Sequence, residues 1–577
     1  MATGTATMLE HLPPGSLLVL GALVVPLLRG VPRQAWLLVV PILSFAHLLS
    51  LAHGSYGHIL LFDVTLTMTR IDKLSLVWGY IFHIAAFLSA LYAAHVKDGM
   101  QQVAALIYAG SAIAGAFAGD LITLFVCWEL TAVSSVFLIW ASRTESSYRA
   151  GMRYLVIQVG SGVLLLSGVL IHYAKTGSLA FEHLGPLSFI DNLGPTLIFI
   201  AFGMKCAFPF LHNWLQDAYP EATATGTVFL SAFTTKLAVY ALARGFAGTE
   251  ILVPIGAAMT AFPVFYAVIE NDLRRVLAYS LNNQLGFMVV GIGIGSEMAL
   301  NGAASHAFAH IIYKALLFMS MGAILHRVGT VKATELGMLY RSMPITTFFC
   351  IIGALSISAF PLFSGFVTKS MTLTAAAEGH YDIAFFVLIF ASAGVLHHSG
   401  IKIPFYGFFG HHDSGIRVKE APWNMLLAMG ISAFLCVAIG VYPQPLYDIL
   451  PYPVDFEPYT ASHVVTQLQL LVFALLAFVV LALKHLETPE LRCTNVDFDV
   501  LYRRLLPAVL RGVGSVVAAI RDGVIDTGKS LVGLFIAVIH LTHGPSGVAA
   551  RTVLTSTAVA IVIVLLFVHL LFNYLTF

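Results

Sequence analysis

The sequence predicts an all-α polytopic membrane protein. Of its 577 residues, 58% are hydrophobic and only 10% are charged, whereas soluble domains carry about a quarter charged residues. Apolar runs recur along the whole chain, each close to the ~20 residues that a helix needs to cross ~30 Å of hydrocarbon. Because these runs fill most of the length, we expect about 14–16 transmembrane helices and no large soluble domain.

Turn residues and charges divide the apolar runs into separate spans. Reading the apolar windows between these signals places spans at 15–31, 36–53, 74–95, 102–118, 120–141, 151–174, 195–216, 222–245, 250–270, 277–296, 298–325, 344–375, 383–410, 424–443, 463–485 and 548–575. The charges of the connecting loops provide an independent test of this segmentation.

Lysine and arginine concentrate in alternate loops. Most of them fall in the odd-numbered loops of this segmentation, and the even-numbered loops hold only Arg70, Lys73, Lys175 and Arg244. By the positive-inside rule, which counts Lys and Arg in short loops, the odd-numbered loops are cytoplasmic and both termini lie outside. We therefore expect a multi-pass protein of a bacterial inner (plasma) membrane.

Two segments differ from the predicted spans. Residues 54–73 alternate apolar and polar side chains, which predicts a short extracellular strand or hairpin. Residues 496–543 carry scattered charges on an apolar background, which is typical of a helix lying along the cytoplasmic interface. If continuous, this helix is roughly 70 Å long, although Pro507 can interrupt it near its start. The final span, 548–575, then anchors its far end.

Composition argues against several other classes of protein. A formal net charge of +1 offers no basic field for nucleic acid. The five cysteines are widely scattered without a CxxC pair, which gives no support for an iron–sulfur cluster, a c-type haem or a zinc site. They are Cys127, Cys206, Cys350, Cys436 and Cys493. The pairs His397–His398 and His411–His412 lie near a loop without further ligands. We expect no metal, no cofactor and no nucleic-acid partner.

The informative residues are ionisable groups near the middle of predicted spans. Each costs at least ~2.5 kcal/mol at the centre of a membrane helix unless it is paired or hydrated, so such positions are functional candidates. The first group comprises Glu129 in LITLFVCWELTAVSSVFLIW, Lys205 in TLIFIAFGMKCAFPFLHNW and Lys236 in VFLSAFTTKLAVYALA. The alternative interpretation of Glu129 and Lys205 is an interhelical salt bridge that serves structure alone, and a structural role is equally open for Lys236.

A second group follows about a hundred residues later. His306, His310 and Lys314, in SHAFAHIIYKALLF, are spaced four apart and therefore stack along one helix face. Lys369 follows in SISAFPLFSGFVTKSMTL. A proton relay needs lysines that desolvation can neutralise, histidines that titrate near neutral pH and a carboxylate such as Glu129 to modulate the first lysine. The alternatives are satisfied core histidines and, for Lys369, snorkelling to the membrane surface.

Two prolines interrupt the spans that carry Lys205 and Lys369. Pro209 lies four residues after Lys205 and removes the helix hydrogen bond to the carbonyl of Lys205. Pro361 precedes Lys369, and both prolines occur as Ala-Phe-Pro. Interrupted helices in the two halves of a chain indicate a transporter built from repeats, with its site at the breaks. The tripeptide alone is weak evidence, because 261–263 repeats it without a nearby charge.

Three stretches of this sequence resemble a known family. They are MKCAFPFLHNWLQDAYPEATATGTVFLSAFTTKLAVYAL, ENDLRRVLAYSLNNQLGF and SHAFAHIIYKALLF. They look like the signature stretches of the proton-pumping, antiporter-like subunits, which include the large membrane subunits of complex I and the A and D components of Mrp-type multisubunit cation/proton antiporters. The resemblance covers roughly residues 70–485, and details such as PLFSGFVTKS look more like the D component of the Mrp branch than like complex I.

The resemblance implies how the chain is organised. Two inverted five-helix repeats, each with a broken helix, would occupy 101–245 and 246–410, after N-terminal helices and the hairpin in 1–100. Further transmembrane helices would occupy 411–490. Residues 491–577 resemble a short version of the lateral helix and terminal anchor with which some complex I and hydrogenase relatives clamp neighbouring subunits.

The resemblance also implies roles for the buried charges of the first repeat. Glu129 resembles the glutamate of the family's fifth helix, and Lys205 resembles its partner lysine on the first broken helix. Lys236 resembles the lysine that bridges the two repeats. A gating pair followed by a bridging lysine is therefore expected in the first half of the channel.

In the second repeat the resemblance implies the remainder of the relay. His306, His310 and Lys314 resemble the histidine-containing relay helix. Lys369 resembles the charged residue of the second broken helix, where some members have glutamate. Together with Pro209 and Pro361, these residues complete the expected site.

We therefore expect a proton-translocating subunit of a multisubunit monovalent cation (Na⁺)/proton antiporter, with other membrane subunits as partners. The alternative is a membrane subunit that energises a complex I-like dehydrogenase, a membrane-bound hydrogenase or an inorganic-carbon uptake complex. If the chain is part of an enzyme, it is expected to be a non-redox membrane subunit of an NADH:quinone oxidoreductase-like complex, because the sequence contains no redox motif. A largely structural subunit with an inactive channel is the third alternative.

Overall fold

The computed structural model describes residues 12–61, 63–410, 414–484, 491, 495–547 and 554–575. The chain divides into two compact units, Met1–Asn495 and Val496–Phe577. The pair His411–His412, Cys493 and the first and last residues of the chain lie outside the described residues.

The described part of the chain contains 12 helices that are long and apolar enough to cross a membrane, together with shorter apolar helices at Ser16–Leu27, Leu193–Cys206 and Pro344–Ile357. The prediction of an all-helical, multi-pass membrane protein is therefore confirmed. Every predicted span contains at least one helix. Fewer helices reach full crossing length than the 14–16 spans expected, partly because the predicted spans 195–216 and 344–375 are each divided into two shorter helices.

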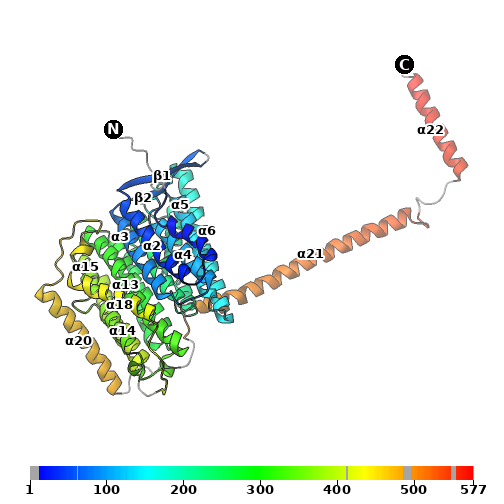
Figure 1. Ribbon diagram of the computed structural model, residues 1–577. Coiled ribbons are helices and arrows are strands. Elements are labelled where there is room, and N and C mark those ends of the chain that lie inside the picture. Colours follow the sequence, from blue (N-terminus) through cyan, green and yellow to red (C-terminus); the bar gives the residue numbers. More distant parts are fainter. Residues whose placement is uncertain are drawn as a thin grey trace, which may run out of the picture. The chain divides into compact units, whose positions relative to one another are not determined.

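The N-terminal part of the first unit consists of helices and one hairpin. The elements are α1 (Ser16–Val24), the 3₁₀ helix η1 (Val25–Leu27), α2 (Val31–Ser50), β1 (Gly54–Leu61), β2 (Val64–Ile71) and α3 (Lys73–Tyr92). The strands pair antiparallel, with Gly54 opposite Ile71 and Leu61 opposite Val64, and they lie at one end of the bundle (Figure 1). The prediction of a hairpin at 54–73 is confirmed.

The middle of the first unit contains two successive groups of helices. The first group is α4 (Gly99–Ala116), α5 (Leu121–Trp140), α6 (Glu145–Thr176), α7 (Leu193–Cys206), α8 (Asn213–Ala218), α9 (Gly226–Ala232) and α10 (Thr234–Gly245). The second group is α11 (Leu252–Ile269), α12 (Leu273–Ile294), α13 (Glu297–Val328), α14 (Pro344–Ile357), α15 (Ser364–Glu378), α16 (Asp382–Val395), η4 (Leu396–Ile401), α17 (Lys402–Pro404) and η5 (Phe405–Phe409). The unit ends with α18 (Trp423–Val441), α19 (Gln444–Tyr447) and α20 (Ala461–Leu483).

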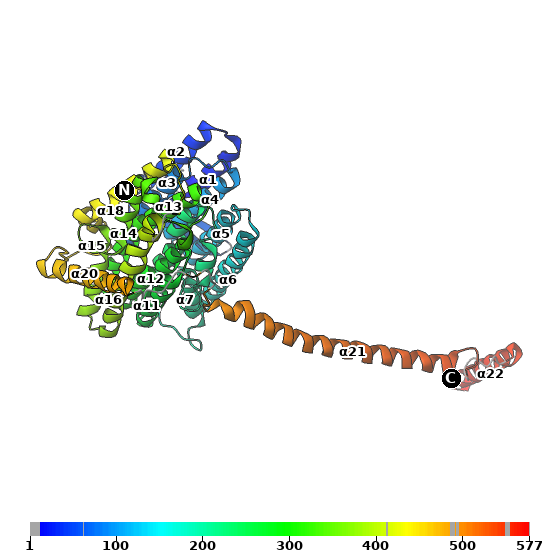
Figure 2. The ribbon, with the colours of Figure 1, turned by 90° about the horizontal axis from the view of Figure 1, so that it is seen from below.

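Helix α13 lies at the centre of the first unit. It packs against α3, α9, α12, α14, α15 and α18, and nearly all of its residues are buried. Figure 2 shows α13 in the interior of the bundle. This position explains the polar residues of α13, because an ionisable side chain on a central helix can avoid contact with lipid.

The two predicted helix breaks have the same backbone form. Between α7 and α8, Ala207 and Phe210 have φ values of 63° and 70°, and between α14 and α15, Ala359 and Leu362 have φ values of 58° and 73°. These left-handed residues flank Pro209 and Pro361 and stop each helix. By contrast, Pro263 lies inside the continuous helix α11, so the Ala-Phe-Pro tripeptide does not by itself break a helix.

A third break was not predicted. The expected span 222–245 is divided at Phe233 into α9 and α10. The amide of Thr234 is bound by the hydroxyl of Tyr108 at 3.0 Å, and the carbonyl of Leu230 accepts a hydrogen bond from the hydroxyl of Tyr219 at 2.7 Å. Two tyrosines on other elements thus replace bonds that a continuous helix would make for itself. No proline or glycine marks this break in the sequence.

The predicted span 383–410 is helical but not uniform. Its second half contains two segments with π-helical hydrogen bonding, η4 and η5, separated by the short helix α17. Such segments are rare inside α-helices and frequently occur at functional sites. Pro404 directly precedes η5, whereas η4 contains no proline, and periodicity analysis does not detect the wider turn of either segment.

The second unit consists of the π-helical segment η6 (Leu501–Leu505), α21 (Leu506–His543) and α22 (Thr555–Leu575). Pro507 lies at the start of α21, directly after η6, and the helical segment Leu501–His543 continues through it, so Pro507 does not interrupt the helix. The 38 residues of α21 extend about 57 Å. None of the described side chains of α21 or α22 is buried.

Candidate functional site

Lys205 lies at the C-terminal end of α7, directly before the first break, and has no exposed surface. Its Nζ donates hydrogen bonds to the carbonyl of Trp128 at 2.7 Å and to Thr131 Oγ1 at 3.0 Å. The same atom lies 4.2 Å from the centroid of the Trp128 ring, a cation–π geometry. Groups on α5 therefore hold the amine without a carboxylate.

Glu129 is half-buried on α5 and packs against α6. A methyl group added at Gly162 would overlap Glu129 Oε1, so the absence of a side chain there makes room for the carboxyl group. Oε1 has no hydrogen-bond partner among the described residues. Glu129 and Lys205 are within electrostatic range of each other, but neither a hydrogen bond nor a salt bridge joins these two described side chains. The structure thus does not show a closed ion pair.

Lys236 is fully buried at the beginning of α10. Its Nζ donates to the carbonyl of Ser231 at 2.7 Å. That carbonyl lies in α9, just before the break at Phe233. The amine thus binds a carbonyl of its own interrupted helix, in the same way as the cations that stabilise helix C-termini.

On α13, His306 belongs to a hydrogen-bonded network. Its Nδ1 lies 3.2 Å from Thr368 Oγ1 of α15, and its Nε2 lies 3.4 Å from the hydroxyl of Tyr313. The Tyr313 hydroxyl donates to Gln284 Oε1 of α12 at 3.1 Å. His306 therefore has one polar partner on α15 and one on its own helix, and Tyr313 links it to Gln284 of α12.

His310 and Lys314 lie on the same face of α13 and are fully buried. The rings of His306 and His310 are 6.2 Å apart, and Lys314 Nζ lies 5.9 Å from the centroid of the Phe318 ring. Neither nitrogen of His310, nor Lys314 Nζ, has a hydrogen-bond partner among the described residues. Buried polar atoms without a protein partner are rare and usually mark a functional group or a place for water.

Lys369 lies on α15, after the second break, and only 1% of its surface is exposed. Its Nζ donates to the carbonyl of Ile357, the last residue of α14, at 3.1 Å, and lies 5.0 Å from the centroid of the Phe287 ring. The amine is buried inside the bundle and bound to a helix carbonyl, so snorkelling does not explain this lysine.

The structure brings most of the predicted residues together. His310 is within electrostatic range of Lys236, His306, Lys314 and Lys369. These five residues therefore form one buried cluster on α10, α13 and α15. Glu129 and Lys205 stand beside it, and Cys206, the neighbour of Lys205, is within electrostatic range of Lys236.

Several polar residues of the same region were missed by the sequence analysis. Tyr313 and Gln284 belong to the His306 network. His398 and Lys402, on η4 and α17, are at most 2% exposed, although 383–410 was treated as a span without a functional charge. Lys402 is an ionisable residue within a predicted span. The same criterion that selected Lys205, Lys236 and Lys369 would therefore have selected it.

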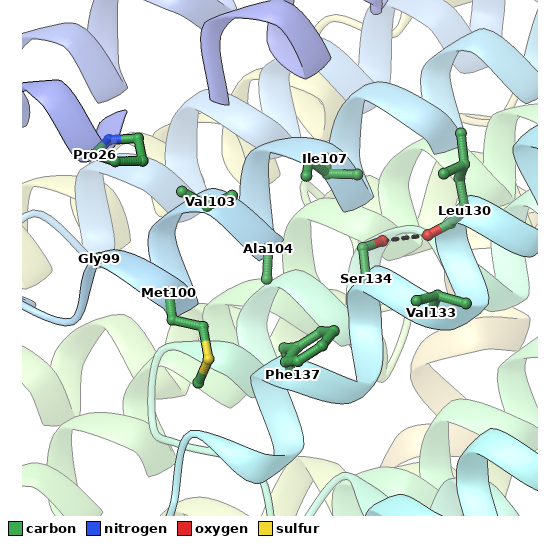
Figure 3. A pocket seen from close by; sticks show the side chains of 10 residues that line it. All are labelled: Pro26, Gly99, Met100, Val103, Ala104, Ile107, Leu130, Val133, Ser134 and Phe137. Atoms are coloured by element: carbon green, nitrogen blue, oxygen red, sulfur yellow. Dashed lines mark hydrogen bonds between the residues drawn. The ribbon is translucent and has the colours of Figure 1, made fainter. Parts of the chain in front are cut away.

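An apolar cavity of about 530 Å³ lies elsewhere, between η1, α4 and α5. Figure 3 shows Met100, Val103 and Ile107 of α4 and Phe137 of α5 along its wall. None of the predicted relay residues lines this cavity. No group of three or more His, Cys, Asp or Glu side chains in the described part of the chain could hold a metal ion.

Comparisons with known proteins agree with this architecture. Residues 118–396 match the family described as NADH:quinone oxidoreductase/Mrp antiporter, transmembrane. The chain is similar to a structure of the Mrp complex from Dietzia sp., with a TM-score of 0.68 and 20% identity over 77% of this chain and 96% of that one. At this identity the likeness shows the fold.

Two relatives are similar to this chain in amino-acid sequence. A Na⁺/H⁺ antiporter subunit of Alkalihalophilus pseudofirmus is 31% identical over 356 residues, which are 58% of this chain and 71% of that protein. Hydrogenase-4 component B of Escherichia coli is 27% identical, over 66% of this chain and 62% of its own length. The chain therefore belongs to the NADH:quinone oxidoreductase/Mrp antiporter family of membrane subunits.

Proposed function

We propose that this chain is the proton-translocating subunit of a multisubunit monovalent cation/proton antiporter. The observation that carries the proposal is a set of buried basic side chains, three of them beside helix breaks and three on the central helix α13. Six of them are at most 1% exposed: Lys205, Lys236, His306, His310, Lys314 and Lys369. Like charges buried this close cannot all be protonated at once without a large cost. When several buried groups share fewer protons than there are sites, a proton can move from an occupied group to an unoccupied neighbour.

The proposed path follows the order of these groups in the fold. Protons enter at Lys205, pass to Lys236 at the break between α9 and α10, and reach the His310 and Lys314 pair on α13. They leave through the region of Lys369. His310 and Lys314, whose nitrogens lack protein partners among the described residues, are suited to exchange protons through water.

Glu129 and Lys205 form the proposed gate. Lys205 Nζ binds the Trp128 carbonyl, while the Glu129 carboxyl is turned toward Gly162. A shift of the amine toward the carboxylate would favour the protonated lysine, and its return to the neutral carbonyl would favour release. The conformation of the Lys205 side chain can thereby control the entry of protons into the path.

The energy source in this proposal is an ion gradient. Two similarities support an antiporter: the likeness to a protein named as a Na⁺/H⁺ antiporter subunit and the fold shared with an Mrp complex. We propose Na⁺ as the coupled cation and a bacterial inner membrane as the location, with both termini outside. The two inverted repeats at 101–245 and 246–410 remain part of the proposal.

A second candidate function is a membrane module that energises a partner enzyme, such as a hydrogenase, a complex I-like dehydrogenase or an inorganic-carbon uptake system. The similarity to hydrogenase-4 component B favours it, as do the exposed apolar side chains along α21 and α22, which suit contacts with other membrane subunits. Purification of the intact complex distinguishes the two, because small membrane subunits support the antiporter and redox subunits support the enzyme module.

Substitution of Lys205 tests proton translocation. In vesicles that contain the whole complex, we expect Lys205→Ala to reduce pH-gradient-driven cation exchange at least tenfold, because the entry group is lost. Lys205→Arg should fail similarly, since arginine keeps the charge but does not release its proton in proteins. Lys332→Ala, which changes an exposed loop lysine, is the matched control. Wild-type exchange in an assembled Lys205→Ala complex would contradict the proposal.

A further inference from the structure

A second set of buried polar residues lies on the π-helical part of the span 383–410. His398 and Ser399 have no exposed surface, and Lys402 is 2% exposed. Both segments adjoining α17 are π-helical, and this geometry inside an otherwise α-helical span is frequently functional. Membrane spans rarely bury ionisable residues without a partner or a task. These residues therefore need an explanation that the proposed relay does not supply.

Helix α12 connects this set with the relay helix. At one point on α12, Gln284 accepts from the Tyr313 hydroxyl at 3.1 Å, and Tyr313 is adjacent to His306. One turn earlier on the same helix, Ser280 Oγ accepts from Ser399 Oγ at 2.7 Å. Residues four apart lie on the same helix face. The polar face of α12 thus touches both the relay and the π-helical segment.

The hydrogen bonds continue to His398. Its Nδ1 lies 2.8 Å from Ser399 Oγ, whereas its Nε2 has no hydrogen-bond partner among the described residues although the side chain is fully buried. His398 is within electrostatic range of both Lys314 and Lys402. His398 thus couples the hydrogen-bonded pair Ser280–Ser399 electrostatically with two buried lysines.

Contacts with helix α11 show toward which end of the bundle this set of residues extends. The Asn283 amide, next to Gln284, donates to the carbonyl of Thr260 on α11 at 2.5 Å. Lys402 Nζ donates to the carbonyl of Val268 at 2.5 Å, which is about 12 Å farther along the same helix. Val268 lies in the last turn of α11, which a short loop joins to the first turn of α12 with Arg274 and Arg275. The positive-inside rule places this end of the two helices on the cytoplasmic side.

We propose that His398 and Lys402 form a second proton branch, which connects the relay helix α13 with the cytoplasmic side through Ser280 and Ser399. In each transfer, protonated Lys402 gives one proton to cytoplasmic water and becomes a neutral amine. It then takes one proton from His398, which is reprotonated from the Lys314 region, so no net charge accumulates on the branch. This proposal rests on the proposed function and adds a route to it.

A purely structural role for Lys402 makes a different prediction. A cation that binds a carbonyl in the last turn of a helix stabilises that helix, and Lys402 would do so for α11. Arginine supplies the same charge and the same kind of N–H donor, but it does not deprotonate in proteins. Arginine should therefore replace a structural lysine and fail to replace a proton carrier.

The test measures pH-gradient-driven exchange by the complete complex in vesicles. We expect Lys402→Met and Lys402→Arg each to reduce exchange at least tenfold while complex assembly is retained. Ser280→Ala should reduce it several-fold, because the contact with Ser399 is lost. Ser432→Ala is the matched control, since this fully buried serine donates to a carbonyl of its own helix, that of Ala428.

The outcomes separate this branch from the proposed function. If Lys402→Arg exchanges at the wild-type rate, Lys402 is structural and the branch is wrong. If Lys402→Met prevents assembly, the arginine variant still decides, because it preserves the charge at α11. If Lys205→Ala loses exchange and Lys402→Arg exchanges normally, the proposed branch is wrong and the proposed function still stands. Normal exchange in Lys205→Ala removes the proposed function itself.

Discussion

Backbone carbonyls, and not carboxylates, accept the hydrogen bonds of three buried lysines. Lys205 binds Trp128, Lys236 binds Ser231 and Lys369 binds Ile357 through the carbonyl oxygens. A carboxylate at hydrogen-bond distance would hold the proton on each amine, whereas a neutral carbonyl favours the charged form much less. At the scale of single residues, the site is therefore suited to release protons as well as to bind them.

Gly162 allows a direct test of the Glu129 position. We expect Gly162→Ala to lower exchange several-fold, because the new methyl group would overlap Glu129 Oε1 and displace the carboxyl group. The measurement is cation exchange in vesicles. Gly160→Ala is the matched control on the same helix, since its methyl group would have Met204 Cε as its nearest neighbour, at 4.0 Å. Equal exchange rates in the two variants would show that the carboxyl position is unimportant.

At the scale of elements, interrupted helices create the carbonyl groups that Lys236 and Lys369 bind. An α-helix leaves its last four carbonyls without internal partners, and each break places such carbonyls inside the bundle instead of at its surface. Lys369 binds at the end of α14, and Lys236 binds beside the break between α9 and α10. The breaks thus provide polar sites at membrane depth without additional charged residues.

Tyr108 is the residue with which to test the third break. The Tyr108 hydroxyl contacts both the amide and the side-chain oxygen of Thr234, at 3.0 Å and 2.6 Å. We expect Tyr108→Phe to lower the free energy of unfolding by about 1–3 kcal/mol, the cost of buried polar groups left without a partner, and to slow exchange. Thermal unfolding of the purified complex measures the first effect. Tyr56→Phe, which removes an exposed hydroxyl in the hairpin, should change neither quantity.

At the scale of the whole molecule, the second unit differs from the first. The first unit has a continuous buried core, whereas none of the described side chains of α21 and α22 is buried within the chain. Exposed apolar residues run along both helices. The relatives are named as a subunit and a component, and in the proposed function this unit holds neighbouring membrane subunits.

Deletion of residues 496–577 tests that role. We expect the shortened chain to insert into the membrane and to retain its fold, because the first unit is compact by itself. Its recovery with other subunits of the complex should fall at least several-fold. Co-purification through a tag on another subunit measures this loss. Undiminished recovery of the shortened chain with its partners would contradict an assembly role for α21 and α22.

The sequence by itself determined the membrane class, the hairpin, the divided spans at Pro209 and Pro361, and the burial of the lysines and histidines of the predicted relay, but not that of His398 and Lys402. These features depend on local composition. The cost of a charge within an apolar span and the helix-breaking effect of a proline are both set by a few neighbouring residues of the sequence. Glu129, Lys205 and Lys369 could be found in this way without any knowledge of their neighbours.

Only the tertiary structure decided which partners those residues have. The break at Phe233 depends on hydroxyl groups of Tyr108 and Tyr219, which come from other elements of the bundle. Lys205 binds α5 and does not pair with Glu129, and Lys402 reaches a carbonyl of α11. A hydrogen bond forms over about 3 Å in space, and the distance between two helices in space is set by the packing of the whole bundle.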